Sequence, residues 1–149
     1  MKIYIGADHR GYELKEKIKS WLTGQNFQVE DLGAHSFDMV DDYTGYAAKV
    51  ASAVSLERGS LGLLFCASGM GMSIMANKFD GVRSATAINP AQVASGRKDD
   101  DINVLSIASE FSSEDMVKQM ISAFLHTNFS PEERFLRRLN DIKKIETNN

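Results

Sequence analysis

Short apolar runs alternate along this chain with segments whose apolar residues recur at the spacing of a helix. The run at residues 60–66 (SLGLLFC) carries no charged residue and leads directly into a turn of small residues. A strand that is apolar on both faces is typical of a parallel sheet covered by helices on both sides. The alternation therefore predicts an α/β fold with a mainly parallel sheet.

Five strands and six helices are expected from this pattern. The strands are expected at residues 2–8, 27–33, 60–66, 81–88 and 102–109. The helices are expected around residues 14–22, 43–55, 71–79, 89–97, 112–125 and 130–142. Ser112 with Asp115 resembles a capping box for the fifth helix, and Ser130, Pro131 and Glu133 would cap the sixth. No repeat or linker interrupts the pattern, so residues 1–149 are expected to form one domain.

Composition narrows the class of protein. The 149 residues suit one domain with a full-sized core. The net charge of −3 shows no excess of basic residues of the kind that binds nucleic acid. No apolar run approaches the ~18 residues of a membrane span, and the first residues lack the apolar core of a signal peptide. The single cysteine, Cys66, cannot form an internal disulfide or a thiolate metal cage. We expect a cytoplasmic protein with no nucleic-acid or membrane partner.

Candidate site residues occur where the expected strands end. Asp8, Gly33, Cys66 and Ser109 each close a predicted strand. In a parallel sheet the carboxyl ends of the strands share one edge, and ligands bind there. We therefore expect these four residues to lie near the ligand-binding edge.

Cys66 could be a small buried apolar residue or a reactive thiol. Free cysteine is among the most buried residue types, which favours the first interpretation. Its position favours the second, because the segment CASGMG forms a turn of small residues between a strand and a helix. Backbone N–H groups in such a turn bind anions, and the positive end of the helix adds to their field. A thiol in that field is expected to have a lowered pKa and to act as a base or nucleophile.

The segment GADHRG places three polar residues after the first strand. Asp8 could act at the site or could cap the following helix. His9 and Arg10 are adjacent and can both carry positive charge, which suits a phosphate. The glycines of the CASGMG turn could simply allow tight packing of strand against helix, since neither the dinucleotide nor the P-loop fingerprint is present.

Other candidate residues also allow a purely structural interpretation. Tyr43 follows two acidic residues and could be a packed side chain behind a helix cap. The run at residues 97–103 (RKDDDIN) is typical of a solvated loop. Arg134 and Arg138 are four residues apart, so they share one face of the last helix, which could be a solvated face.

Together these segments resemble the ribose-5-phosphate isomerase B family, which also includes the subunits of galactose-6-phosphate isomerase. The matching segments run nearly from end to end, and they are IGADHRGYELK, VEDLG, DDYTGYA, FCASGMGMSIMANKFDGVRSA, INVL and the arginine-bearing last helix. The resemblance implies a Rossmann-like three-layer α/β/α sandwich with an extra C-terminal helix. It also implies a homodimer or a dimer of dimers, in which the partner subunit completes each active site.

The resemblance implies that the protein interconverts an aldose phosphate and a ketose phosphate with neither a metal nor an organic cofactor. Cys66 would be the base that moves a proton between C1 and C2. The developing enediolate oxygen would be held by the turn, which comprises Ala67, Ser68, Gly69, Met70 and Gly71. Asp8 would contact sugar hydroxyls or assist proton movement, and Tyr43 would line the pocket. The phosphate would be bound by His9 and, from the partner, by Arg134 and Arg138. This chemistry needs a base near neutral pKa and a preorganised anion site, which agrees with the features of the turn.

The chain departs from the family pattern in three places. Ribose isomerases of the family usually carry a histidine, which opens the sugar ring, and then an asparagine where this chain has Asp99 and Asp100. Glu110 replaces a further family arginine, and the turn reads Ala67-Ser68 where Gly-Thr is common. Ring opening could then fall to Asp99, with Asp100 beside the substrate. The added acids are expected to make the partner-side pocket more acidic.

These departures leave other functions open. The chain could act on a six-carbon sugar phosphate, such as galactose 6-phosphate or allose 6-phosphate, alone or as one subunit of such an isomerase. It could also bind a phosphosugar without catalysis. A doubly wound cofactor-binding domain fits the fold class but lacks the glycine fingerprint. The preferred function is interconversion of ribose 5-phosphate and ribulose 5-phosphate through an enediolate, a step of the pentose phosphate pathway.

Overall fold

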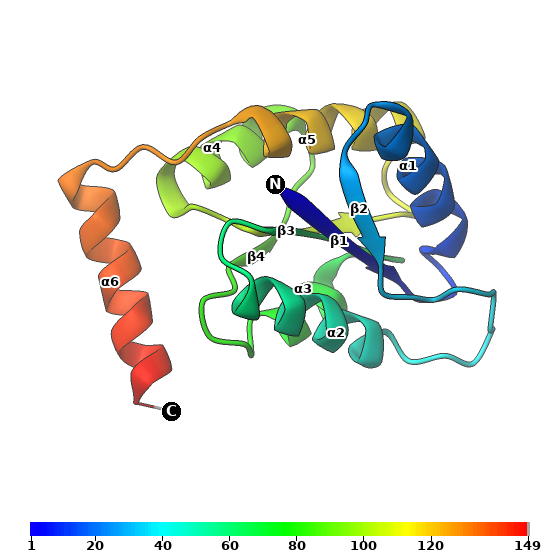
Figure 1. The fold of residues 1–149 in the computed structure, drawn as a ribbon, viewed down its shortest axis with the longest axis horizontal. Helices are drawn as coiled ribbons and strands as arrows, with labels where there is room; N and C mark the ends of the chain where they lie inside the picture. The colour runs from blue at the N-terminus through cyan, green and yellow to red at the C-terminus, as the bar shows by residue number, and fades with distance from the viewer. Residues whose placement is uncertain (149) are drawn as a thin grey trace.

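The computed structural model describes residues 1–148. Five strands form one sheet in the order β2-β1-β3-β5-β4, and every neighbouring pair is parallel (Figure 1). The strands are β1 (Lys2–Ala7), β2 (Gln28–Asp31), β3 (Leu61–Cys66), β4 (Ser84–Thr86) and β5 (Val104–Ala108). The predicted α/β fold is therefore confirmed, and its sheet is wholly parallel.

Helices cover both faces of this sheet, which gives the expected three layers. One face is covered by α1 (Tyr12–Gly24), α4 (Pro90–Asp100) and α5 (Glu114–His126). The other is covered by α2 (Tyr43–Leu56) and α3 (Met70–Ala76). The last helix, α6 (Glu133–Thr147), stands apart from these layers at the left of Figure 1. Among the described residues, no helix offers an apolar stretch of the length that a membrane crossing requires.

The two faces of β3 build two separate apolar cores. Leu61, Leu63 and Phe65 pack with α1, α4 and α5, whereas Leu64 and Cys66 pack with α2 and α3. This division follows from the alternation of side chains along a strand. All six residues of β3 are buried, as the apolar run predicts. The Cys66 side chain therefore points toward the layer formed by α2 and α3.

The sheet order places a topological switch point between β1 and β3. From β1 the chain moves outward to β2 on one side, and β3 then pairs with β1 on its other side. In open parallel sheets, ligands bind outside the carboxyl ends of the strands that flank such a point. Asp8 and Cys66 stand at those two strand ends.

Capping differs from the prediction at two helices. The N-cap of α5 is Ser113 rather than Ser112, because the Ser113 hydroxyl accepts a hydrogen bond from the Met116 N–H at 3.3 Å. The N-cap of α6 is Glu132, and its predicted capping residue Ser130 instead donates its N–H to the Lys98 carbonyl at 2.9 Å. The segment before α6 is thus fastened to α4. The acidic run at residues 97–103 was expected in a loop, but α4 extends through Asp100 and includes the first part of the run.

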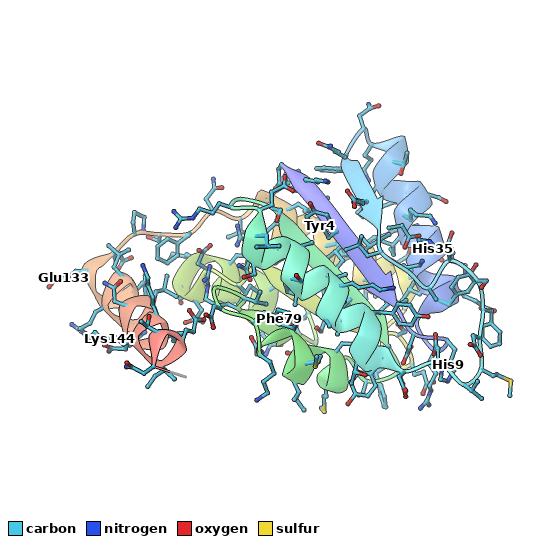
Figure 2. All side chains as sticks on the ribbon, turned by 60° about the horizontal axis from the view of Figure 1, so that its bottom comes forward. Tyr4, His9, His35, Phe79, Glu133 and Lys144 are labelled. Atoms are coloured by element: carbon cyan, nitrogen blue, oxygen red, sulfur yellow. The ribbon has the colours of Figure 1, made fainter. Side chains whose placement is uncertain are left out.

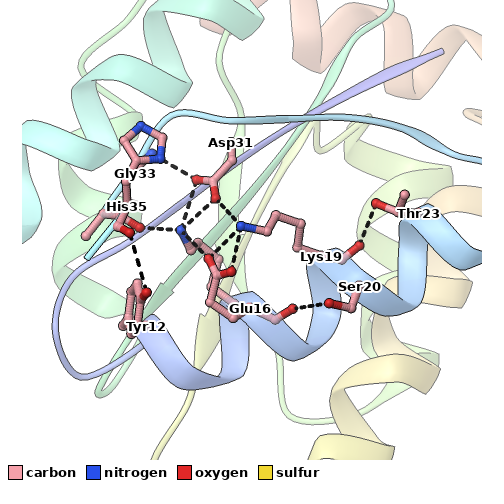
Figure 3. A network of polar contacts seen from close by, with 10 residues as sticks. Tyr12, Glu16, Lys19, Ser20, Thr23, Asp31, Gly33 and His35 are labelled. Carbon is pink, nitrogen blue, oxygen red and sulfur yellow. Dashed lines mark hydrogen bonds and ion pairs between the residues drawn. The ribbon is translucent and has the colours of Figure 1, made fainter. Parts of the chain in front are cut away.

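One lysine of α1 is completely buried, which the helical apolar stripe did not predict. The ammonium group of Lys15 lies 2.9 Å from both carboxylate oxygens of Asp31 and 2.5 Å from the Ala34 carbonyl. Glu16 and Lys19 complete the network around Asp31 (Figure 3). A buried charge is tolerated only when it is paired and hydrogen-bonded. The network thereby ties α1 to the start of the loop between β2 and α2.

Candidate active site

Asp8 occupies the carboxyl end of β1 and is buried. Its backbone N–H donates to the Phe65 carbonyl at 3.2 Å, which joins the ends of β1 and β3. Its carboxylate accepts hydrogen bonds from the backbone N–H groups of Arg10 and Gly11, each at 3.0 Å. Burial raises the pKa of Asp8, and these two hydrogen bonds oppose the rise. Asp8 is not the N-cap of α1, because Gly11 takes that position, and its carboxylate instead closes the turn before the helix. It lies close enough to Cys66 for its charge to act on the thiol, and its role at the site stays a prediction.

Cys66 closes the central strand, with 5% of its surface exposed. Its Sγ accepts a hydrogen bond from the Gly69 N–H at 3.1 Å. Burial raises the pKa of the thiol, and this effect outweighs the opposing hydrogen bonds from the turn, while the negative charge of Asp8 adds to the rise. The expectation of a lowered pKa is therefore wrong for the single chain. The sequence revealed the N–H groups of the turn but not the depth of the thiol.

The turn after Cys66 is braced by the exits of the neighbouring strands. Gly69 has φ of +74°, and a Cβ built there would lie 2.7 Å from Thr86 Cγ2 and 2.9 Å from the Ser106 carbonyl oxygen. The Ser109 N–H donates to the Cys66 carbonyl at 2.9 Å. Only glycine combines that backbone conformation with so close an approach. These contacts preorganise the N–H groups that the turn would offer to an anion.

Tyr43 begins α2 and lies against the same turn. A Cβ at Gly71 would come within 2.9 Å of the Tyr43 ring carbon Cζ. The residue is 39% exposed, so part of it remains open to solvent. The structure thus brings Tyr43 beside the Cys66 turn, and its expected role in lining a substrate pocket stays a prediction.

His9 is held by a residue that the sequence suggested only as a possible helix cap. The Asp41 Oδ1 atom lies 2.7 Å from the His9 Nδ1 and 3.0 Å from the His9 backbone nitrogen, which donates to it. The N-cap of α2 is Asp42, so Asp41 is not used as the cap. The two residues are 32 positions apart, and no periodic signal connects them. The only sequence signal for this contact is the pair of acidic residues, Asp41 and Asp42, before Tyr43.

Arg10 and Glu110 form a two-pronged ion pair at this edge. The guanidinium Nε and Nη2 atoms donate to the two carboxylate oxygens of Glu110, both at 2.6 Å. Arg10 follows β1 and Glu110 follows β5, so the pair links the exits of the two strands that flank β3. Both side chains are about half exposed, at 51% and 43%. Glu110 therefore neutralises an arginine of its own chain.

The remaining predicted residues lie far from Cys66 within one chain. Asp99 and Asp100 end α4, which leads back to the amino end of β5. Arg134 and Arg138 lie on α6, and Figure 2 shows His9 at the opposite end of the molecule from Glu133 of α6. The Arg134 guanidinium stacks over the Phe135 ring at 4.5 Å. A single chain therefore gathers only one half of the predicted site.

A cavity of about 630 Å³ lies between α6 and the amino ends of the strands. Arg83, Arg97 and Asn140 are among its lining residues, and the Cys66 turn does not reach it. Within residues 1–148, no group of three histidine, cysteine or acidic side chains is arranged to hold a metal ion. The chemistry available at the Cys66 edge is that of a thiol, a carboxyl group and a cradle of backbone N–H groups.

Known proteins are similar to this chain along nearly its whole length. Residues 3–142 match the family described as Ribose/Galactose Isomerase. The probable ribose-5-phosphate isomerase B of Mycoplasma pneumoniae is 37% identical over 127 residues, covering 85% of this chain and 84% of that protein. The ribose-5-phosphate isomerase B of Escherichia coli is 34% identical over 145 residues, covering 97% and 96%. The crystal structure of the Mycoplasma genitalium enzyme with bound ribulose-5-phosphate aligns with a TM-score of 0.95 at 35% identity, covering 99% and 97%.

Proposed function

Because this chain belongs to the ribose/galactose isomerase family, we propose that it is an aldose–ketose isomerase that interconverts ribose 5-phosphate and ribulose 5-phosphate. The observation that carries the proposal is the Cys66 thiol, held by the Gly69 N–H at the switch point of the sheet beside the buried Asp8. Relatives that share the fold bear that activity in their names, and one of them binds ribulose-5-phosphate.

The proposed reaction moves one proton between neighbouring carbons. The Cys66 thiolate removes the proton from C2 of the open-chain aldose, and electrons move onto the C1 oxygen to give an enediolate. The N–H groups of the turn stabilise that oxygen, and returning the proton to C1 gives the ketose. Asp8 moves the hydroxyl proton between the two oxygens. Its raised pKa suits this role, because it brings the carboxyl group closer to a neutral working pH.

The other half of the proposed site comes from a second copy of the chain. Asp99, Asp100, Arg134 and Arg138 would reach the Cys66 edge of a partner, with the arginines and His9 on the phosphate and Asp99 opening the sugar ring. Exposed apolar side chains support such a contact. On α6 they are Leu136, Ile142 and Ile145, and near the Cys66 edge they are Met70, Ile74 and Phe111. We propose a homodimer, or a dimer of dimers, with shared active sites.

Mixing two inactive variants tests the shared site. Cys66→Ala removes the base, and Arg134→Ala with Arg138→Ala removes the phosphate ligands. Random exchange of subunits makes half of the dimers mixed, and each mixed dimer has one intact site, so roughly a quarter of wild-type turnover should return. Each variant alone, carried through the same exchange, is the control. If mixing restores no turnover, the site is not shared between subunits.

Assay of the wild-type protein with ribose 5-phosphate, following ribulose 5-phosphate, tests the activity itself. Turnover at about 1–1000 per second would support the proposal. Turnover only on a six-carbon sugar phosphate would favour the hexose isomerase, a candidate motivated by the two acids at positions 99 and 100. Tight binding of sugar phosphates without product would indicate a binding protein. We place the enzyme in the pentose phosphate pathway and in the cytoplasm, where a lone free thiol stays reduced.

A further inference from the structure

We propose that Asp41 is a positioning residue, which holds the His9 imidazole with its Nε2 atom toward the substrate phosphate. The inference rests on the proposed function, because it takes His9 as a phosphate ligand. Asp41 lies in the loop between β2 and α2, yet only 5% of its side chain is exposed. Its Oδ1 atom receives both the backbone N–H and the ring Nδ1 of His9. One carboxylate oxygen thus fixes the backbone and the ring of the same residue.

The chemistry of the contact decides which ring nitrogen faces the site. An ionised carboxylate only accepts hydrogen bonds, so the His9 Nδ1 atom carries its proton toward Asp41. The Nε2 atom is then the ring nitrogen left for a ligand, and the side chain is 27% exposed. A phosphate oxygen also only accepts, so the ring that binds phosphate is protonated on both nitrogens and positively charged. The Asp41 carboxylate lies directly against that charge.

The second carboxylate oxygen supports a role for the charge itself. Asp41 Oδ2 is buried and has no hydrogen-bond partner within residues 1–148. A buried unpaired polar atom costs free energy and calls for an explanation. The contact with the His9 ring offers that explanation, because a carboxylate stabilises a protonated ring by its charge and a neutral amide does not. The Tyr46 phenol beside it stays neutral, because burial and then the charge of Asp41 raise its pKa.

Two substitutions separate the charge from the hydrogen bond. Asp41→Asn keeps an oxygen that can accept both hydrogen bonds of His9 but removes the negative charge. Asp41→Ala removes the acceptor as well. Asp42→Asn is the matched control, because Asp42 is exposed, makes no side-chain cap hydrogen bond and loses the same charge one position further along.

The measurements are titration calorimetry with inorganic phosphate, the KM and kcat for ribose 5-phosphate, and nitrogen-15 NMR of the histidine rings. Asp41→Asn should weaken phosphate binding and raise KM about tenfold, the size of one charge-assisted contact, with kcat within about twofold. Asp41→Ala should in addition shift the neutral His9 ring toward the tautomer protonated on Nε2. Asp42→Asn should match the wild type in every measurement.

Two results would overturn the role of Asp41. One is phosphate binding in Asp41→Asn equal to that of the wild type, and the other is an unchanged ring spectrum in Asp41→Ala. A purely structural role would lower the thermal stability of both variants without changing the tautomer. If the wild type binds neither phosphate nor ribose 5-phosphate, the proposed function fails. The ring spectrum of Asp41→Ala then still decides whether Asp41 positions His9.

Discussion

Replacing Gly69 with alanine should disrupt the Cys66 turn. The φ of +74° costs an alanine about 1–2 kcal/mol. The new Cβ would also lie 2.7 Å from Thr86 Cγ2 and 2.9 Å from the Ser106 carbonyl oxygen, so β4 or β5 must shift. Forcing a methyl group into such a packed site costs about 1–3 kcal/mol more. The expected loss of unfolding free energy is therefore about 2–5 kcal/mol.

Two glycines provide the controls for the backbone contribution. Gly59 and Gly81 have φ of +84° and +75°, and a Cβ at either position meets no atom within 4 Å. Gly59→Ala and Gly81→Ala should therefore lose only the conformational part, about 1–2 kcal/mol each. Urea unfolding at one fixed protein concentration measures all three variants, because the stability of the proposed dimer would depend on concentration.

Isomerase turnover provides the second readout for Gly69→Ala. The Gly69 N–H donates to the Cys66 thiol, and the turn holds the proposed oxyanion donors. Displacing one such donor costs about 10²–10³ in kcat. The two control variants should keep wild-type turnover. If Gly69→Ala matches the controls in both stability and turnover, the close packing of the turn is not what organises the site.

Three further outcomes are expected. Because burial raises the pKa of Cys66, the thiolate fraction and the kcat measured at saturating substrate should increase as pH rises through neutrality to above about pH 8.5, and a flat kcat profile would exclude the thiolate as base. Asp8 has a raised pKa, so its stabilising contribution is complete only below the ordinary aspartate pKa and is lost as pH rises. Asp8→Asn should therefore be at least as stable toward unfolding as the wild type at pH 7, and any gain in unfolding free energy should vanish near pH 3. The turnover of Asp8→Asn should fall. Lys15→Met should cost about 3–5 kcal/mol in urea unfolding by leaving Asp31 short of a partner, and adding Asp31→Asn should recover part of that loss.

The elements that the sequence predicted best are those whose pattern is local. The strand β3 follows from an unbroken apolar run and the helix α5 from apolar residues at helical spacing, and both elements lie where they were expected. The burial of Lys15 could not be predicted from a local pattern, because its partner Asp31 comes from β2 and only the folded chain brings the two together. The same reason explains the misplaced cap at Ser112, since the choice between neighbouring serines depends on the approach of the chain to α5.

The candidate site was predictable where its residues follow strand ends. Asp8 and Cys66 meet because parallel strands end at one edge, which the strand–helix alternation already implied. The Asp41–His9 contact was not predictable, since it depends on the path of an irregular loop. The direction of the Cys66 pKa shift also required the structure, because burial depth competes with the N–H groups of the turn.

The brace around the Cys66 turn has a consequence for synthesis of the chain. Arg10 and Glu110 are 100 positions apart, and the Cys66 carbonyl is bound by Ser109, made 43 residues later (109 − 66). At a translation rate of about 5–20 residues per second, the thiol emerges about 2–9 s before β5 can brace it. Contacts of such long range also form late in folding. Catalytic activity is therefore a property of the finished chain, and a nascent chain that carries Cys66 without β5 has the proposed base but not the site around it.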